Sequence, residues 1–172
     1  MKKIFGIVGW KNSGKTTLMV KLIERFTAEG LIVASLKHAQ HQVDNDQPGR
    51  DSFRHREAGA SQVALVTARR VMIVEELGNR AEPTIDEVIA RLQPADLYLI
   101  EGFKTHPHLK IEVRAEDCDQ PLLAATDPNI RAIAADLPMP NCGRPRFDRD
   151  DIEGIARFIR QQTGLIREAV SR

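Results

Sequence analysis

The stretch GWKNSGKT near the start of the chain has the residue types and spacing that bind the phosphates of a nucleotide. It fits the pattern G-x-x-x-x-G-K-[ST], in which Gly9 and Gly14 let the backbone turn so that successive N–H groups point at phosphate oxygens. Lys15 adds a charge for the β- and γ-phosphates and thereby a catalytic role, and the Thr16 hydroxyl is placed to hold Mg²⁺. We therefore predict a phosphate-binding loop (P-loop) whose nucleotide contacts are Gly9, Trp10, Lys11, Asn12, Ser13, Gly14, Lys15, Thr16 and Thr17.

Glu101 is the candidate for the second acidic group that a P-loop enzyme needs to hold magnesium. It follows the continuous apolar run Leu97–Ile100, which is typical of a buried parallel strand, and Gly102 after it allows the backbone to approach closely. Ligand sites in such sheets lie at the carboxyl ends of the strands. We therefore predict that Glu101 is a magnesium ligand and a catalytic residue; the alternative is a strand-end glutamate that faces solvent.

The polar segment from Lys37 to Asp51 follows the second predicted strand and should face the same edge of the sheet as the P-loop. Three interpretations are open. The segment could be a switch that approaches the γ-phosphate and Mg²⁺, with Asp51 as a metal ligand. It could be a transition-metal site built from imidazoles and carboxylates, or an ordinary solvated loop. The residues concerned are His38, His41, Asp44, Asp46 and Asp51, whereas His106 and His108 further on lack a third ligand.

Two aspartates follow later apolar runs, and their loops could enclose a purine. Asp127 ends the run 122–125 and Asp136 ends the run 130–135, both expected to be strands. We predict Thr126 and Asp127 as nucleotide contacts, with the Asp127 carboxylate accepting hydrogen bonds from N1 and N2 of guanine. An aspartate that caps a helix or a turn is the alternative. The chain has no N-K-x-D sequence, so the choice between GTP and ATP does not follow from motifs.

The apolar pattern predicts the elements that would position these residues. Helices are expected from the P-loop to Gly30, over 52–58 with Asp51 as its cap, from a Thr84–Glu87 capping box to 92, and over 152–159 behind Asp150 and Asp151. Further strands are expected over 4–8, 31–36, 62–66, 70–74 and 109–113, and the last should be more exposed because apolar and charged residues alternate in it. Such alternation of strands and helices predicts an α/β fold, a mostly parallel sheet with helices on both faces.

Composition limits the class of protein. A length of 172 residues, with 42% hydrophobic and 28% charged residues, suits one soluble domain over residues 1–172. The net charge of +1 gives no electrostatic reason to expect nucleic acid or a membrane surface as a partner. Two cysteines are too few for a disulfide scaffold, so we expect a cytoplasmic protein.

Four segments together resemble the MobB family, P-loop GTP-binding proteins of molybdopterin guanine dinucleotide biosynthesis. They are GWKNSGKTT, LKHAQH, PGRDSFRHREAGA and LIEGFK, and the similarity spans nearly the whole chain. The resemblance implies a P-loop NTPase three-layer sandwich, a homodimer, and GTP bound with Mg²⁺ at Gly9–Thr17, with Glu101 as the strand-end acid. It also implies assistance to the guanylyltransferase that joins GMP to molybdopterin, with molybdoenzyme maturation proteins as further partners.

Hydrolysis of GTP is expected to be slow at most. Some relatives in the wider class carry a lysine at the second P-loop position that reaches across a dimer, but here Trp10 stands there and Lys11 follows. Arg54 is the nearest candidate for an arginine finger. Two other functions stay open from the residues: a metal-insertion GTPase of the metallochaperone type that uses His38 and His41, and an ATP-dependent small-molecule ligase or kinase.

Overall fold

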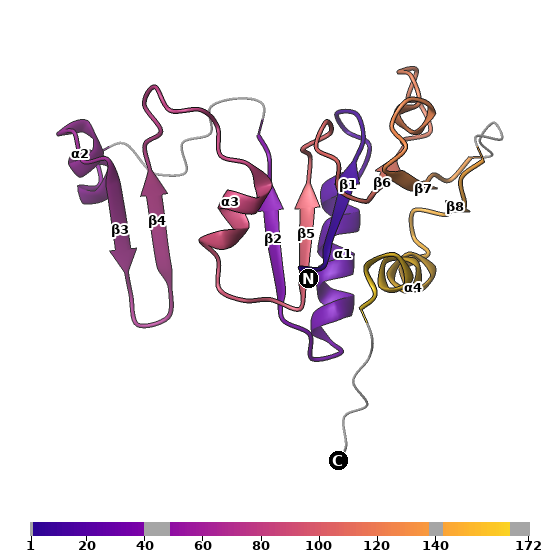
Figure 1. The fold of residues 1–172 in the computed structure, drawn as a ribbon, viewed down its shortest axis with the longest axis horizontal. Helices are drawn as coiled ribbons and strands as arrows, with labels where there is room; N and C mark the ends of the chain where they lie inside the picture. The colour runs from indigo at the N-terminus through magenta and orange to yellow at the C-terminus, as the bar shows by residue number, and fades with distance from the viewer. Residues whose placement is uncertain (1, 40–48, 138–142, 166–172) are drawn as a thin grey trace, which may run out of the picture. The chain divides into compact units, whose positions relative to one another are not determined.

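The computed structural model describes residues 2–39, 49–137 and 143–165, and these form two compact units (Figure 1). The first unit comprises the described residues of Met1–His38 and Pro94–Arg172, and the second those of Ala39–Gln93. The prediction of one domain over residues 1–172 stays a prediction. None of the described helices is long and apolar enough to cross a membrane.

A six-stranded sheet organises the first unit. Its order is β2-β5-β1-β6-β7-β8, and every neighbouring pair is parallel. The strands are β1 (Ile4–Val8), β2 (Val33–Lys37), β5 (Leu97–Glu101), β6 (Lys110–Val113), β7 (Ile130–Ala134) and β8 (Arg146–Phe147). The sequence did not predict β8, which is only two residues long. The predicted α/β fold class, with a mostly parallel sheet, is confirmed, and β1 is a central strand whose carboxyl end leads into the P-loop.

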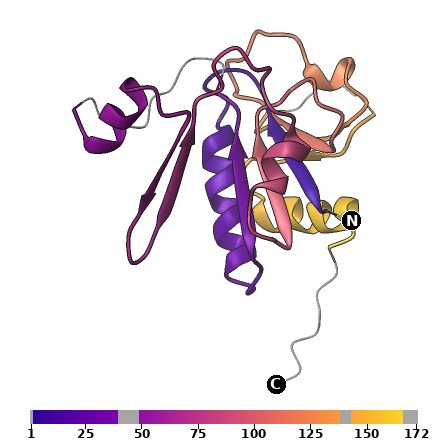
Figure 2. The same ribbon diagram turned by 60° about the vertical axis from the view of Figure 1, so that its left-hand side comes forward.

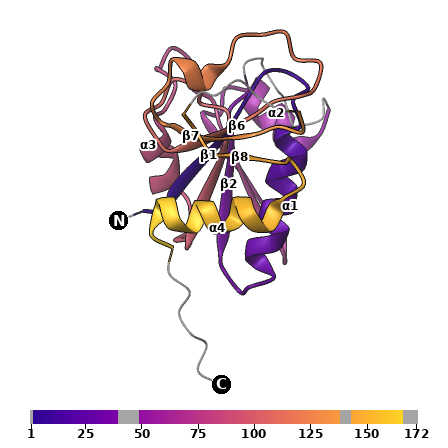
Figure 3. The same cartoon turned by 90° about the vertical axis from the view of Figure 1, so that its right-hand side faces the viewer.

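Two helices cover one face of this sheet. The helix α1 (Lys15–Thr27) and the helix α4 (Ile152–Thr163) pack against each other and against β1, as Figure 3 illustrates. Phe5 of β1 is fully buried there, and its ring meets the ring of Phe158 edge-on at 6.3 Å. Leu22 and Phe26 of α1 are also fully buried, as their helical spacing predicted.

The other face of the sheet carries buried charge, and this overturns the expectation that the strand over 109–113 is more exposed. Lys110 and Glu112 are both 0% exposed. The Lys110 ammonium donates to the carbonyl oxygens of Lys104 and His106 and to Asp127 at 2.7, 2.8 and 2.5 Å. Alternation of apolar and charged residues indicates an exposed strand only when the charges have no partners inside, because a buried charge must be paired.

The run 122–125 was predicted as a strand, and this was wrong. Leu123–Ala125 form a 3-10 turn, η1, whose Ala124 packs with Val8 and β7 on this second face. The Glu112 carboxylate accepts hydrogen bonds from the backbone N–H groups of Leu123 and Ala124 at 3.1 and 2.8 Å. These two bonds satisfy N–H groups that a strand would pair in a sheet, so the chain turns here instead.

The described residues of the second unit form two helices and a hairpin (Figure 2). The antiparallel strands β3 (Gln62–Val66) and β4 (Val71–Glu75) form the predicted hairpin. The helix α3 (Ile85–Ala90) begins at the predicted Thr84–Glu87 capping box. The helix α2 (Asp51–Glu57) starts one residue earlier than predicted, so Asp51 is its first residue and Arg50 occupies the cap position.

Candidate nucleotide-binding site

The P-loop backbone takes a path that only glycine permits at two positions. Gly9 has a φ of 152°, and a Cβ there would lie 2.3 Å from the Val113 carbonyl oxygen and 2.6 Å from the Ser13 hydroxyl. Gly14 has a φ of 92° and directly precedes α1. The loop therefore lies tightly over the end of β6, with Ser13 only 1% exposed.

Lys15 lies over this loop, where positive charge gathers. Its ammonium donates to the Trp10 carbonyl oxygen at 2.5 Å and to the Ser13 hydroxyl at 3.4 Å. Burial lowers the pKa of Lys15, the nearby Glu101 carboxylate opposes this, and the charges of Lys104 and Lys37 lower the pKa further. A phosphate anion would stabilise this cluster, which also lies at the positive end of a helix.

The predicted pair of magnesium ligands is brought together. The Thr16 hydroxyl donates to both oxygens of the Glu101 carboxylate, each at 3.1 Å. The contact joins the first turn of α1 to the end of β5, which lies between β1 and β2 and pairs Glu101 with Ile7 and Lys37. Glu101 is 8% exposed, and the Lys37 ammonium lies 3.3 Å from its carboxylate. A hydroxyl and a carboxylate are the hard oxygen donors that Mg²⁺ prefers, so these residues fit the ion.

Trp10 is fixed by two contacts that the sequence did not indicate. Its indole N–H donates to the Pro121 carbonyl oxygen at 2.8 Å, and the Lys104 ammonium lies over its ring, 4.2 Å from the centroid. The Arg114 guanidinium holds the same loop through the carbonyl oxygens of Cys118 and Gln120, both at 2.9 Å. Trp10, at the second P-loop position, is thus packed against the loops that carry Lys104 and Pro121.

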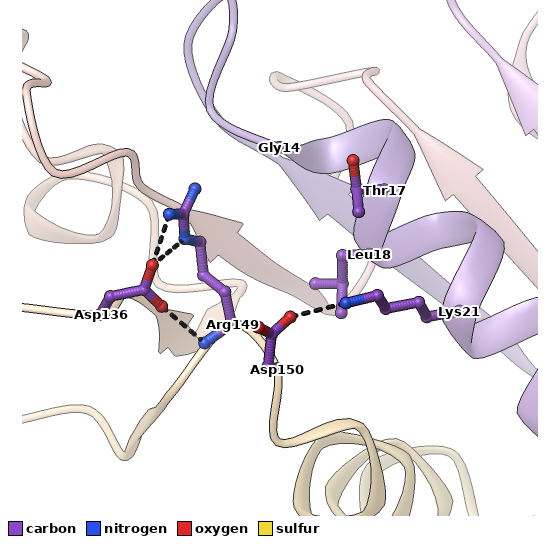
Figure 4. A pocket seen from close by; sticks show the side chains of 7 residues that line it. All are labelled: Gly14, Thr17, Leu18, Lys21, Asp136, Arg149 and Asp150. Carbon is purple, nitrogen blue, oxygen red and sulfur yellow. Dashed lines mark hydrogen bonds and ion pairs between the residues drawn. The ribbon is translucent and has the colours of Figure 1, made fainter.

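A pocket of about 190 Å³ opens beside the first two turns of α1 (Figure 4). Its lining residues are Gly14, Thr17, Leu18, Lys21, Asp136, Arg149 and Asp150. The Arg149 Nε donates to Asp136 at 2.7 Å, and this bond is the main cause that lowers the pKa of the Asp136 carboxyl. Of these residues only Gly14 and Thr17 were predicted as nucleotide contacts. Leu18 and Lys21 lie just beyond the P-loop motif, and no motif links that loop to Asp136, Arg149 or Asp150.

Thr126 and Asp127 do not line this pocket. They follow the 3-10 turn and precede β7, so the prediction that they end a strand was wrong. One Asp127 oxygen accepts from Lys110, and the other accepts from the Asn129 backbone and side chain at 2.8 and 3.0 Å. Burial raises the pKa of Asp127, but these hydrogen bonds outweigh it and lower the pKa overall. The carboxylate therefore has a structural role, and its contact with guanine stays a prediction.

The histidines form no metal cluster in the part of the chain that the structure describes. His106 and His108 approach each other at 3.1 Å between their Nδ1 atoms, and no third His, Cys, Asp or Glu joins them there. Burial, with the nearby charges of Lys110 and His106, lowers the pKa of His108 to about 4, so its imidazole is neutral at pH 7. His38 stacks on the ring of Phe103 with 4.4 Å between centroids.

The remaining predicted residues lie outside the described residues, in the second unit, or on the exposed side of the P-loop. His41, Asp44 and Asp46 fall outside the described residues. Asp51 and Arg54 lie on α2 in the second unit, so a magnesium ligand at Asp51 and an arginine finger at Arg54 stay predictions. The exposed Lys11 and Asn12 are part of the loop between Gly9 and Gly14.

Comparisons with known proteins now assign the chain to a family. The family model described as MobB, "Molybdopterin guanine dinucleotide synthesis protein B", matches residues 4–136. The chain belongs to the MobB family. A protein of Escherichia coli K12 named "Molybdopterin-guanine dinucleotide biosynthesis adapter protein" is 32% identical over 92% of this chain and 92% of its own length. A protein of the same name from Haemophilus influenzae is 35% identical over 91% of this chain and 86% of its own length.

Solved structures of MobB proteins share the fold. The crystal structure of Bacillus subtilis MobB matches with a TM-score of 0.75 at 29% identity, over 94% of this chain and 98% of that one. A MobB homologue from Bacillus stearothermophilus matches with a TM-score of 0.66 at 26% identity, over 92% of this chain and 99% of that one. The resemblance to MobB drawn from the sequence is confirmed. The MobB family match contains the P-loop and Glu101 but ends before Arg149.

The Thr16–Glu101 contact predicts how a Glu101→Gln variant responds to magnesium. The amide keeps the shape of the side chain but loses the charge that attracts the ion. We expect GTP affinity without Mg²⁺ to change little and the added affinity that Mg²⁺ gives the natural protein to be largely lost. Titration calorimetry with Mg²⁺ or with EDTA measures both values, and an equal gain from magnesium in the two proteins would remove Glu101 from the site. Glu24→Gln, a change at an exposed glutamate of α1, is the control.

Proposed function

We propose that this protein is a GTP-binding accessory protein of molybdopterin guanine dinucleotide biosynthesis. In this role it assists the guanylyltransferase that attaches GMP to molybdopterin, in the cytoplasm. The proposal takes its pathway from the MobB family and from the names of the relatives in Escherichia coli and Haemophilus influenzae. Molybdoenzyme maturation proteins, which receive the finished cofactor, are proposed as further partners.

The observation that carries the proposal is the convergence of Lys15, Thr16 and Glu101 at one end of the sheet. Thr16 and Glu101 are 85 positions apart in sequence, yet the hydroxyl and the carboxylate lie 3.1 Å apart at the mouth of the P-loop. In this site the loop amides and Lys15 bind the β- and γ-phosphates. Thr16 and Glu101 would hold Mg²⁺, which supplies positive charge to the phosphate oxygens when bound.

We propose that hydrolysis by the isolated protein is slow. Fast phosphoryl transfer needs a positive charge on the transferred group, and an arginine finger contributes about 10³–10⁵ to the rate. The second P-loop position offers no lysine, since Trp10 is held there by Pro121 and Lys104. A protein that keeps GTP intact suits delivery or positioning of nucleotide for a partner enzyme. The described residues contain no cluster of metal ligands that would favour the metal-insertion alternative.

Reconstitution with the guanylyltransferase tests this role. Adding the protein to guanylyltransferase, molybdopterin and MgGTP should raise the yield of the guanine dinucleotide cofactor. The Lys15→Ala variant should not, when the MgGTP concentration just saturates the natural protein, because the weakened site then stays largely empty. The protein alone should release phosphate from GTP at well below about one turnover per second, since typical kinase rates of ~1–100 s⁻¹ require the full set of catalytic charges. Fast turnover by the protein alone, or equal stimulation by the variant, contradicts the proposal.

We further propose that the protein is a homodimer joined through the β3–β4 hairpin. One face of this hairpin carries Val66, Val71 and Ile73, whose exposed fractions are 68%, 62% and 69%. These residues share a face because Val66 pairs with Val71 and Ala64 pairs with Ile73. Apolar side chains that gather on a small sheet favour burial against a second copy.

The dimer is tested by sedimentation equilibrium of the natural protein and of an Ile73→Lys variant. We expect a dimer for the natural protein and a shift toward monomer for the variant, because an ammonium cannot be buried in an apolar interface without a partner. Met72→Lys, which changes the opposite face of the hairpin, should leave the dimer intact. A monomeric natural protein, or a dimer that Ile73→Lys leaves unchanged, contradicts this interface.

A further inference from the structure

The pocket beside α1 has the right position for the part of a nucleotide that the P-loop does not hold. Gly14, Thr17, Leu18 and Lys21 recur at helical spacing, so they line one face of α1 over about 10 Å. The pocket therefore begins at the P-loop and continues down the helix, past the N–H groups that bind phosphate (Figure 4). Its other wall comes from Asp136 after β7 and from Arg149 and Asp150 after β8.

The order of the sheet gives the direction in which a bound nucleotide would run. Glu101 ends β5, on one side of β1, whereas β7 and β8 lie on the other side, beyond β6. Thr16 and Glu101 would hold a magnesium ion that supplies positive charge to the terminal phosphates, so this pair would mark that end of the nucleotide. The α-phosphate, ribose and base then extend away from Glu101, toward the loops that follow β7 and β8.

The size and lining of the pocket suit a flat ring. Its volume of about 190 Å³ is well below the ~300–1,000 Å³ of pockets that enclose a whole drug-sized ligand, so it suits one part of a nucleotide. Leu18 is the apolar side chain in this lining, and it contributes little surface because it is only 3% exposed. Lys21 is drawn toward Asp150 by an ion pair of 2.6 Å. The rest of the lining is mostly polar, and a ligand site needs at least one polar group whose direction is fixed.

Arg149 is that fixed group. Asp136 accepts from the backbone N–H, the Nε and the Nη2 of Arg149, which sets the direction of the guanidinium. The third guanidinium nitrogen, Nη1, lies 3.5 Å from the Ser13 carbonyl oxygen, at the limit of a hydrogen bond, and would be 3.4 Å from a Cβ on Gly14. This nitrogen therefore presents N–H donors beside the P-loop, where an acceptor atom of a ligand can meet them.

We propose that this pocket binds the purine base of the nucleotide and that Arg149 selects guanine by donating to its O6 atom, with Asp136 as the residue that positions Arg149. Guanine carries an acceptor at this place, whereas adenine carries an amino group that would oppose the guanidinium donor to donor. The inference rests on the proposed binding of a nucleotide triphosphate at the P-loop. It adds the residue that distinguishes GTP from ATP, a choice for which the sequence contains no motif.

Competition binding with GTP, ITP and ATP tests the inference. ITP keeps O6 but lacks the amino group at C2. The natural protein should bind GTP and ITP alike and ATP about 10-fold more weakly, the effect of one hydrogen bond to a charged group. In Arg149→Met the affinities for GTP and ITP should fall to that for ATP. Arg149→Lys should also lose the preference, because an ammonium cannot be held by Asp136 in the same fork geometry.

Controls separate this result from loss of structure or of the whole site. Arg131→Met removes an exposed arginine from β7 and should leave all three affinities unchanged, and melting temperatures verify that each variant is folded. Equal weakening of all three nucleotides by Arg149→Met would assign Arg149 to a phosphate and overturn the inference. An unchanged preference for GTP over ATP in Arg149→Met would also overturn the inference. A natural protein that binds ITP as weakly as ATP would overturn it too. These outcomes leave the proposed function standing, whereas a natural protein that binds no nucleotide contradicts both.

Discussion

The hydrogen bonds between the Thr16 hydroxyl and the Glu101 carboxylate join the two parts from which the site is built. One part is local: Gly9 and Gly14 turn the chain from β1 into α1 and place Lys15 over the loop. The other depends on the sheet, because β5 must lie beside β1 for Glu101 to reach the helix. The sheet order thus places Glu101 on one side of β1 and the strands that lead to the pocket on the other.

Buried charges on the second face of the sheet support this arrangement. Lys110 holds the loop after β5 through the carbonyl oxygens of Lys104 and His106, and the same loop places Lys104 over Trp10. Glu112 and Arg114 hold the segment before β7, to which Trp10 donates a hydrogen bond at Pro121. Burying a charge costs free energy unless it is paired and hydrogen-bonded, and each of these groups has such partners. The P-loop is therefore supported from both neighbouring loops.

The sequence predicted the features that depend on short-range rules and missed those that depend on distant partners. The P-loop, the buried run before Glu101 and the Thr84–Glu87 capping box follow from residues close together in the chain, and the structure contains them. The burial of Lys110 and the 3-10 turn at 123–125 depend on partners that only the fold brings near. For the same reason the sequence did not indicate that Asp127 pairs with Lys110, or that Arg149 lies beside the P-loop, since no local pattern connects these residues.

The affinity of a Lys15→Ala variant for GTP tests the central claim most directly, because the proposed magnesium site, base pocket and accessory role all require a triphosphate at the P-loop. Removing a charged hydrogen-bonded contact should weaken binding by at least about 1.5–3 kcal/mol. The melting temperature should stay near that of the natural protein, because Lys15 is absent from the buried core. Lys2→Ala, at an exposed lysine outside the loop, is the control. A folded Lys15→Ala protein that binds GTP as tightly as the natural protein would contradict the assignment of the site.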